Sequence, residues 1–140
     1  MKLIIAGGRD YKLSASDYRD LYHIHLTYRV SEVVSGCARG ADSCGESWAT
    51  LNDIPIKKFE ASWAKDGRSA GPQRNERMAS YADALAIFPG GNGSQDMLKR
   101  AIRKGLRIFN FMDPGSKQLK LELNPTESAS LPPPPPQPLL

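Results

Sequence analysis

The sequence is poor in the residues that build metal centres and disulfide frameworks. Its 140 residues include two cysteines and two histidines. Cys37 and Cys44 lack the spacing of a metal-binding pair, and His23 and His25 lie on one predicted helix, far along the chain from any carboxylate cluster. No nearby base supports Cys37 as a nucleophile, so we expect it to be a small buried residue. We expect neither a metal site nor a cofactor.

Long apolar runs and strong charge are also missing. Nothing resembles a signal peptide or a membrane span, and together with the few cysteines this favours a soluble protein in a reducing, cytoplasmic setting. The formal net charge is +4. Such a mildly basic protein suits anionic small molecules and gives only weak support for nucleic acid. The length fits one domain with a real core.

The chain instead contains short apolar runs, each followed by a helical pattern. This alternation predicts an α/β fold, a three-layer Rossmann-like sandwich with a mostly parallel five-stranded sheet in the order 3-2-1-4-5. In that order the first and fourth strands are neighbours at the point where the winding reverses. The expected strands cover residues 2–6, 32–34, 56–59, 84–88 and 106–111.

The helical segments carry recognisable starts and inward faces. Ser14 or Ser16 caps the first helix, and Pro72 suits the first position of a later one. Arg74 and Asn75 then fall in the first turn, where a cation opposes the helix dipole unless an anion is bound or the residue is solvated. Two further helices have apolar faces made of Ala41, Cys44, Trp48 and Leu51, and of Met97, Leu98, Ala101 and Ile102.

Three of the expected strands end in loops with glycine. In the predicted strand order these loops face one crevice, where free backbone N–H groups and a helix start favour phosphate. Two side chains keep two interpretations each. Asp42 accepts a sugar hydroxyl or caps its helix, and Trp63 stacks on a base or covers the edge of the core. The predicted ligand contacts are Gly7, Gly8, Arg9, Ser35, Gly36, Arg39, Asp42, Trp63, Arg74, Asn75, Pro89, Gly90, Gly91, Gly93 and Ser94.

Four ordered motifs resemble the SLOG superfamily, which joins the DNA-processing protein DprA/Smf to the Lonely Guy phosphoribohydrolases, and in particular its small YspA-like family of bacteria and phages. The motifs read GGRDY at 7–11, SGCARGAD at 35–42, SWAKDGRSAGPQRNERM at 62–78 and YADALAIFPGGNGSQDM at 81–97. The resemblance extends to about Phe111. It implies a Rossmann-like domain that binds nucleotides or nucleotide-derived ligands.

The Lonely Guy resemblance also implies a reaction, cleavage of the N-glycosidic bond of a nucleoside monophosphate. Arg74 stands at the place of the arginine of that motif, and Ser94 replaces its threonine. Met97 occupies the place of the glutamate, with Asp96 beside it. One residue along a helix turns a side chain by about 100°, so Asp96 does not inherit the role automatically. The catalytic candidates are Arg74 and Asp96.

The DprA-like resemblance implies a different class, a module that binds single-stranded nucleic acid. SGCARGAD, which contains Arg39, and the Arg74-Asn75 pair match positions associated with single-stranded DNA contact. A third hypothesis is a protein that sequesters a nucleotide signal in phage–host conflict without cleaving it. Related proteins often dimerise, so a homo-oligomer is compatible with each hypothesis.

The last part of the chain differs in composition. Residues 132–136 are consecutive prolines, which adopt an extended conformation and cannot join a packed core. We therefore expect a domain over residues 1–113 and a tail over 114–140 that is proline-rich and disordered at its end.

Overall fold

The computed structural model describes residues 1–112, so the predicted proline-rich tail lies outside the described residues. A five-stranded sheet forms the middle layer, in the order β3-β2-β1-β4-β5, and all neighbouring pairs are parallel. The predicted α/β sandwich and its strand order are confirmed. The strands are β1 (Lys2–Ala6), β2 (Glu32–Ser35), β3 (Ile56–Lys58), β4 (Ala84–Ile87) and β5 (Arg107–Asn110).

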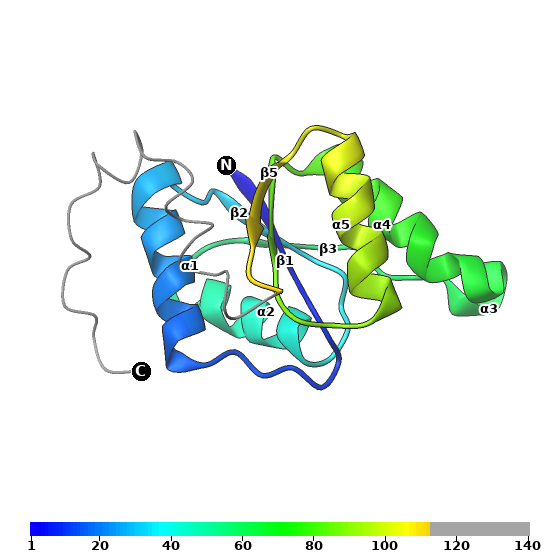
Figure 1. The fold of residues 1–140 in the computed structure, drawn as a ribbon, viewed down its shortest axis with the longest axis horizontal. Helices are drawn as coiled ribbons and strands as arrows, with labels where there is room; N and C mark the ends of the chain where they lie inside the picture. Colours follow the sequence, from blue (N-terminus) through cyan, green and yellow to red (C-terminus); the bar gives the residue numbers. More distant parts are fainter. Residues whose placement is uncertain (113–140) are drawn as a thin grey trace.

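Helices cover both faces of this sheet (Figure 1). Helices α1 (Ala15–Tyr28) and α2 (Ala41–Leu51) lie on one side, and α4 (Ala70–Tyr81) and α5 (Asn92–Arg103) lie on the other. The short helix α3 (Trp63–Asp66) and a 3₁₀ turn at Gly67–Ser69 lead into α4. Because all neighbouring strands are parallel, their carboxyl ends lie at one edge of the sheet, where the loops into the helices begin.

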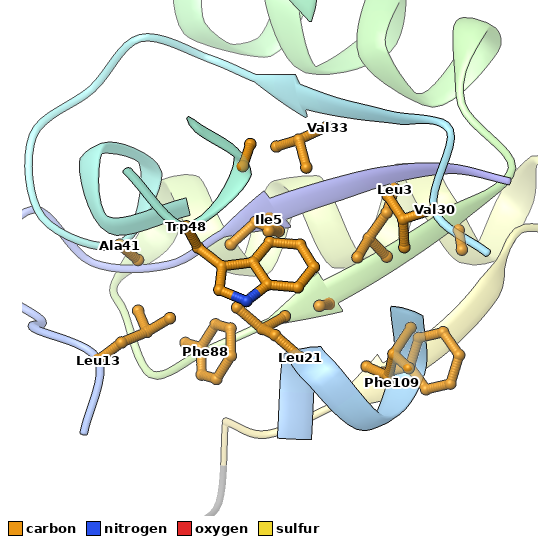
Figure 2. Packing of buried hydrophobic residues seen from close by; sticks show 14 of the residues in the cluster. Leu3, Ile5, Leu13, Leu21, Val30, Val33, Ala41, Trp48, Phe88 and Phe109 are labelled. Atoms are coloured by element: carbon orange, nitrogen blue, oxygen red, sulfur yellow. The ribbon is translucent and has the colours of Figure 1, made fainter. Parts of the chain in front are cut away.

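Alternate residues of β1 belong to two separate cores. Leu3 and Ile5 pack with residues of α1 and α2, whereas Ile4 packs with residues of α4 and α5. Figure 2 shows the first core, with the ring of Trp48 among the apolar side chains around Ile5. Because both faces are covered, the strand reads as a continuous apolar run rather than an alternating one.

Helix α1 begins at Ser14, one of its two predicted caps. The Ser14 hydroxyl accepts a hydrogen bond from the Asp17 amide at 3.1 Å, and the Asp17 carboxylate accepts one from the Ser14 amide at 2.9 Å. This reciprocal pair satisfies two N–H groups that otherwise have no partner at a helix start.

Two predicted inward-facing residues are exposed instead. Leu51 is 68% exposed and Ile102 is 59% exposed. On an ideal helix Leu51 is rotated by about 160° from the buried Ala49, and Ile102 by about 140° from Met97, which removes both from the buried stripe.

The predicted start of α4 was also wrong. The residues before Pro72 fold into α3 and the 3₁₀ turn, so α4 begins at Ala70 and Pro72 is its third residue. Proline is tolerated there because the first N–H groups of a helix have no intrahelical acceptor. Arg74 consequently lies beyond the first turn of α4, where the helix dipole opposes a cation less.

Candidate functional site

A cavity of about 710 Å³ lies at the carboxyl edge of the sheet. The loops after β1, β2 and β4 line it together with α4 and α5. Since β1 and β4 are adjacent, the cavity occupies the topological switch point at which open α/β sheets bind ligands. Of the predicted contacts it brings together Gly7, Gly8, Arg9, Gly36, Asp42, Trp63, Arg74, Asn75, Gly91, Gly93 and Ser94, and it adds Asp96.

The turn after β1 contacts the other two glycine loops directly. The Gly8 amide donates to the Pro89 carbonyl at 2.8 Å, and the Ala41 amide donates to the Gly8 carbonyl at 3.2 Å. A Cβ on Gly90 would lie 2.6 Å from the Gly8 nitrogen. Pro89 and Gly90 therefore join the turns to one another, and neither lines the cavity.

Gly91 and Gly93 have no such packing role. A Cβ on either residue would meet nothing within 4 Å, and neither has a positive φ. Gly91 is the N-cap of α5 and Gly93 belongs to its first turn, where N–H groups lack intrahelical acceptors. Ser94, 7% exposed, lies beside them in the same turn. Two glycines that the fold does not require leave the start of α5 open for close approach by a ligand.

Arg74 is held against the loop after β2. Its Nη1 donates to the Gly36 carbonyl at 3.0 Å, and its Nε and Nη2 lie 3.4 and 3.3 Å from Asn75 Oδ1. A Cβ on Gly36 would lie 3.1 Å from the Arg74 guanidinium carbon. A glycine at position 36 therefore leaves room for the guanidinium against the loop, where it lines the cavity with its position fixed.

Asn75 connects Arg74 to the carboxylate of Asp96. It is 3% exposed, and its Nδ2 donates to Asp96 Oδ2 at 2.9 Å. Arg100 Nε donates to the same oxygen, also at 2.9 Å. Burial alone would raise the pKa of Asp96, but the hydrogen bonds from Arg100 and Asn75 outweigh it and hold the pKa below its usual value. Asp96 is therefore an ionised carboxylate on the cavity wall.

Asp42 is the second carboxylate of the cavity, and its surroundings act in the opposite direction. It is 5% exposed, and burial raises its pKa to about 6, although the Ala38 amide and the charge of Arg74 work against that rise. Its Oδ2 accepts from the Ala38 amide at 3.2 Å. The carboxylate thus braces the loop before α2, and the helix itself has Gly40 as its N-cap.

Ser35 and Arg39 lie outside this cavity. Ser35 is 1% exposed, and its hydroxyl donates to Glu46 Oε2 at 2.5 Å while accepting from the Cys37 amide at 3.1 Å. Arg39 lies on a neighbouring hollow of about 460 Å³. Ser35 is therefore occupied in holding the loop, and Arg39 extends the cationic surface beyond the first cavity.

Trp63 belongs to the wall of the cavity and not to the core. It is 51% exposed and is absent from both buried clusters. A Cβ on Gly71 would lie 3.3 Å from its ring, so the indole rests on the first turn of α4. Its exposed face is free to stack on a planar group.

The sequence did not point to several features of the site. Met78 and Met97, each 2% exposed, line the cavity and also belong to the buried core beneath α4 and α5. Cys37, predicted to be buried, is exposed with a φ of +64°. Partial burial of the sulfur and the nearby Glu46 and Glu60 raise the pKa of its thiol, which weakens it as a nucleophile. Left-handed backbone at a cysteine has no signal in sequence.

Residues 1–112 contain neither a cluster of metal-binding side chains nor a membrane-spanning helix. No three histidine, cysteine or acidic side chains there are grouped to hold a metal ion, and no helix there is long and apolar enough to span a bilayer. His25 accepts from the Val30 amide through Nδ1 at 3.1 Å, and burial lowers its pKa. Its ring also contacts the ring of Trp48 edge-on, so it is a packing histidine.

Comparisons with known proteins agree with this architecture. Residues 1–65 match the family described as "YspA, cpYpsA-related SLOG family". The Gene 61 protein of Mycobacterium phage D29 is 30% identical over 122 residues, which cover 80% of this chain and 97% of that protein.

The fold is similar to the X-ray structure of DNA processing protein A (DprA) from Streptococcus pneumoniae, with a TM-score of 0.61 and 18% identity. The match covers 78% of this chain and 49% of the other, so the chain spans about half the length of that protein. At this identity the likeness concerns the fold.

Proposed function

The chain belongs to the SLOG superfamily, and from this membership we propose that it binds a nucleotide or a nucleotide-derived ligand in the cavity at the switch point. Membership supports a function related to nucleotides or nucleic acids in general. The cavity volume of about 710 Å³ is in the range of small-molecule sites.

One observation carries the proposal, the unfilled space above the start of α5. Gly91 and Gly93 are not required by packing, and Ser94 and the fixed guanidinium of Arg74 line the same cavity. Helix N–H groups, a hydroxyl and a guanidinium are the donors that bind phosphate in proteins. We propose that a phosphate group lies there.

The remaining walls suit the other parts of a nucleotide. The half-exposed ring of Trp63 offers apolar surface for a base, and Asp42 offers a carboxylate to sugar hydroxyls. We propose that the domain formed by residues 1–113 is the ligand-binding unit.

The test is mass spectrometry of the ligand retained by the freshly purified full chain, with a nucleotide panel in a thermal-shift assay. Arg74→Ala should weaken binding at least about tenfold, because a hydrogen bond to a charged group contributes roughly 1.5–3 kcal/mol. Arg19→Ala, an exposed arginine of α1 that does not line the cavity, is the matched control. Absence of any retained nucleotide and of any melting shift in the folded protein would refute the proposal.

Asp96 decides whether the bound ligand is also cleaved. We propose Asp96, with Arg74, as the catalytic pair of an N-glycosidic cleavage, since an ionised carboxylate can stabilise an oxocarbenium-like centre. Incubation of a bound nucleoside monophosphate should then release free base and ribose 5-phosphate, and Asp96→Asn should abolish release. Recovery of the unchanged ligand would instead support sequestration.

A second candidate is binding of single-stranded nucleic acid, favoured by the exposed Arg9, Arg39 and Trp63, which line the neighbouring hollow of about 460 Å³. Such sites combine cationic side chains, which contact the phosphate backbone of the nucleic acid, with aromatic side chains on which its bases stack. Affinity for a single-stranded oligonucleotide should fall steeply with salt. Binding that is absent or independent of salt would remove this candidate.

A further inference from the structure

A second hollow of about 460 Å³ adjoins the first cavity. The two share the wall formed by Arg9, Gly36, Ala38, Trp63 and Arg74. The second hollow alone is large enough for a small ligand group. A ligand seated at the start of α5 can therefore continue past Arg74 into a further compartment.

The charges of the second hollow identify the chemistry that it suits. Arg9, Arg39 and Arg74 face it against one carboxylate, that of Glu60. Within residues 1–112 the side chains of Arg9 and Arg39 form no hydrogen bond or ion pair with the protein. Their donors are available to a ligand anion, and arginine binds phosphate with a planar, two-pronged geometry.

Two backbone amides of this hollow are already committed elsewhere. The Cys37 amide donates to the Ser35 hydroxyl at 3.1 Å, and the Ala38 amide donates to the Asp42 carboxylate at 3.2 Å. Those bonds hold Cys37 at its positive φ of +64°, a conformation that costs free energy unless its surroundings impose it. Anion recognition here consequently falls to the arginine side chains, and hydroxyl recognition falls to Glu60.

We propose that the ligand bound most tightly is a nucleoside diphosphate joined to a second hydroxyl-bearing unit, rather than a mononucleotide. This inference rests on the proposed function of the first cavity. One phosphate lies at the start of α5, the next lies between Arg9 and Arg74 at the shared wall, and the appended unit occupies the second hollow beside Arg39 and Glu60. A mononucleotide leaves that hollow to water.

Isothermal titration of the full chain against two ligand series tests the inference. The series are AMP, ADP and ADP-ribose, and GMP, GDP and GDP-mannose. In the preferred series the complete nucleoside diphosphate sugar should bind at least about tenfold more tightly than the monophosphate, the effect of one charge-assisted contact. Arg39→Ala should bring the affinities for the nucleoside diphosphate sugar and the monophosphate close together, and Arg19→Ala should leave their ratio unchanged.

A variant that fills the hollow gives an independent readout. Ala61 lines the second hollow but not the first cavity, so Ala61→Trp should also lower the ratio, with thermal unfolding confirming that the variant is folded. Equal affinities for the monophosphate and the sugar would overturn this inference and leave the proposed function intact. Failure of every nucleotide to bind would overturn both. Tighter, salt-dependent binding of a (dT)₁₂ oligonucleotide would assign the hollow to nucleic acid.

Discussion

Asp42 and Asp96 line one cavity, yet their surroundings move their pKa values in opposite directions. Asp96 receives hydrogen bonds from the Asn75 amide and the Arg100 guanidinium. Asp42 is more deeply buried and accepts from the Ala38 backbone amide, so burial dominates and its pKa rises to about 6. The cavity thus holds one carboxylate that is ionised at neutral pH and one that titrates near it.

Replacing Asp42 should change how stability depends on pH. Burial raises the pKa of Asp42 from 3.8 to about 6, so between these values the folded protein holds a proton that the unfolded chain has released. The contribution of Asp42 to the free energy of unfolding therefore falls as pH rises through this interval. Relative to wild type, the free energy of unfolding of Asp42→Asn should rise by on the order of 2 kcal/mol from pH 4 to pH 7, as measured by chemical denaturation.

Ser47→Ala, which alters an exposed side chain of the same helix that does not titrate, is the control for that series. Its difference from wild type should stay nearly constant over the same interval. A constant difference for Asp42→Asn as well would show that burial does not govern the titration of Asp42.

At the scale of elements, glycines separate positions that serve packing from positions that serve the cavity. A Cβ on Gly45 of α2 would lie 2.8 Å from Cγ2 of Ile5, a buried residue of β1. A Cβ on Gly93 of α5 would meet nothing within 4 Å. The first glycine sets how closely a helix approaches the sheet, and the second leaves space above a helix start.

Alanine at these two positions should therefore have opposite effects on stability. Gly45→Ala forces a methyl group against Ile5. It should lower the free energy of unfolding by about 1–2 kcal/mol, even after the better helix propensity of alanine is counted. Gly93→Ala should raise the free energy of unfolding by up to about 1 kcal/mol, because alanine has the better helix propensity, and should bind nucleotide more weakly. Urea denaturation and titration measure the two quantities. A Gly93→Ala variant with wild-type affinity would argue against ligand contact at the start of α5.

Sequence patterns predicted elements better than they predicted where those elements begin or which side chains are buried. The run Lys2–Ala6 forms the strand it indicated, because a short apolar segment between helices has few alternatives. Helix α4 began earlier than Pro72 suggested, since the position of a helix start depends on how the preceding segment packs. Leu51 and Ile102 fit an apolar pattern but lie off the buried stripe, which only the orientation of each helix decides.

At the scale of the whole molecule, the strand order determined which distant loops could meet. Alternation of strands and helices predicted a mostly parallel sheet, and the strand order adopted for it is the observed β3-β2-β1-β4-β5, which places the loops after β1 and β4 side by side. Which residues of these loops pack on one another and which line the cavity was not predictable from the sequence. Whether Gly90 packs on Gly8 while Gly93 faces open space depends on ångström-scale distances that composition does not encode.

The packing of the last described residues predicts that residues 1–113 fold without the tail. Phe111 is 1% exposed, stacks on Phe88 with ring centroids 5.2 Å apart, and donates its amide to the Ile87 carbonyl at 2.7 Å. A chain ending at Asp113 retains these contacts. Its melting temperature should lie within about 4 °C of the full chain, equivalent to less than about 1 kcal/mol, with equal nucleotide affinity. A chain ending at Ile108 loses Phe109 and Phe111 from the core and should not unfold cooperatively. A large drop in the melting temperature of the 1–113 chain would mean that the tail contributes to the folded domain.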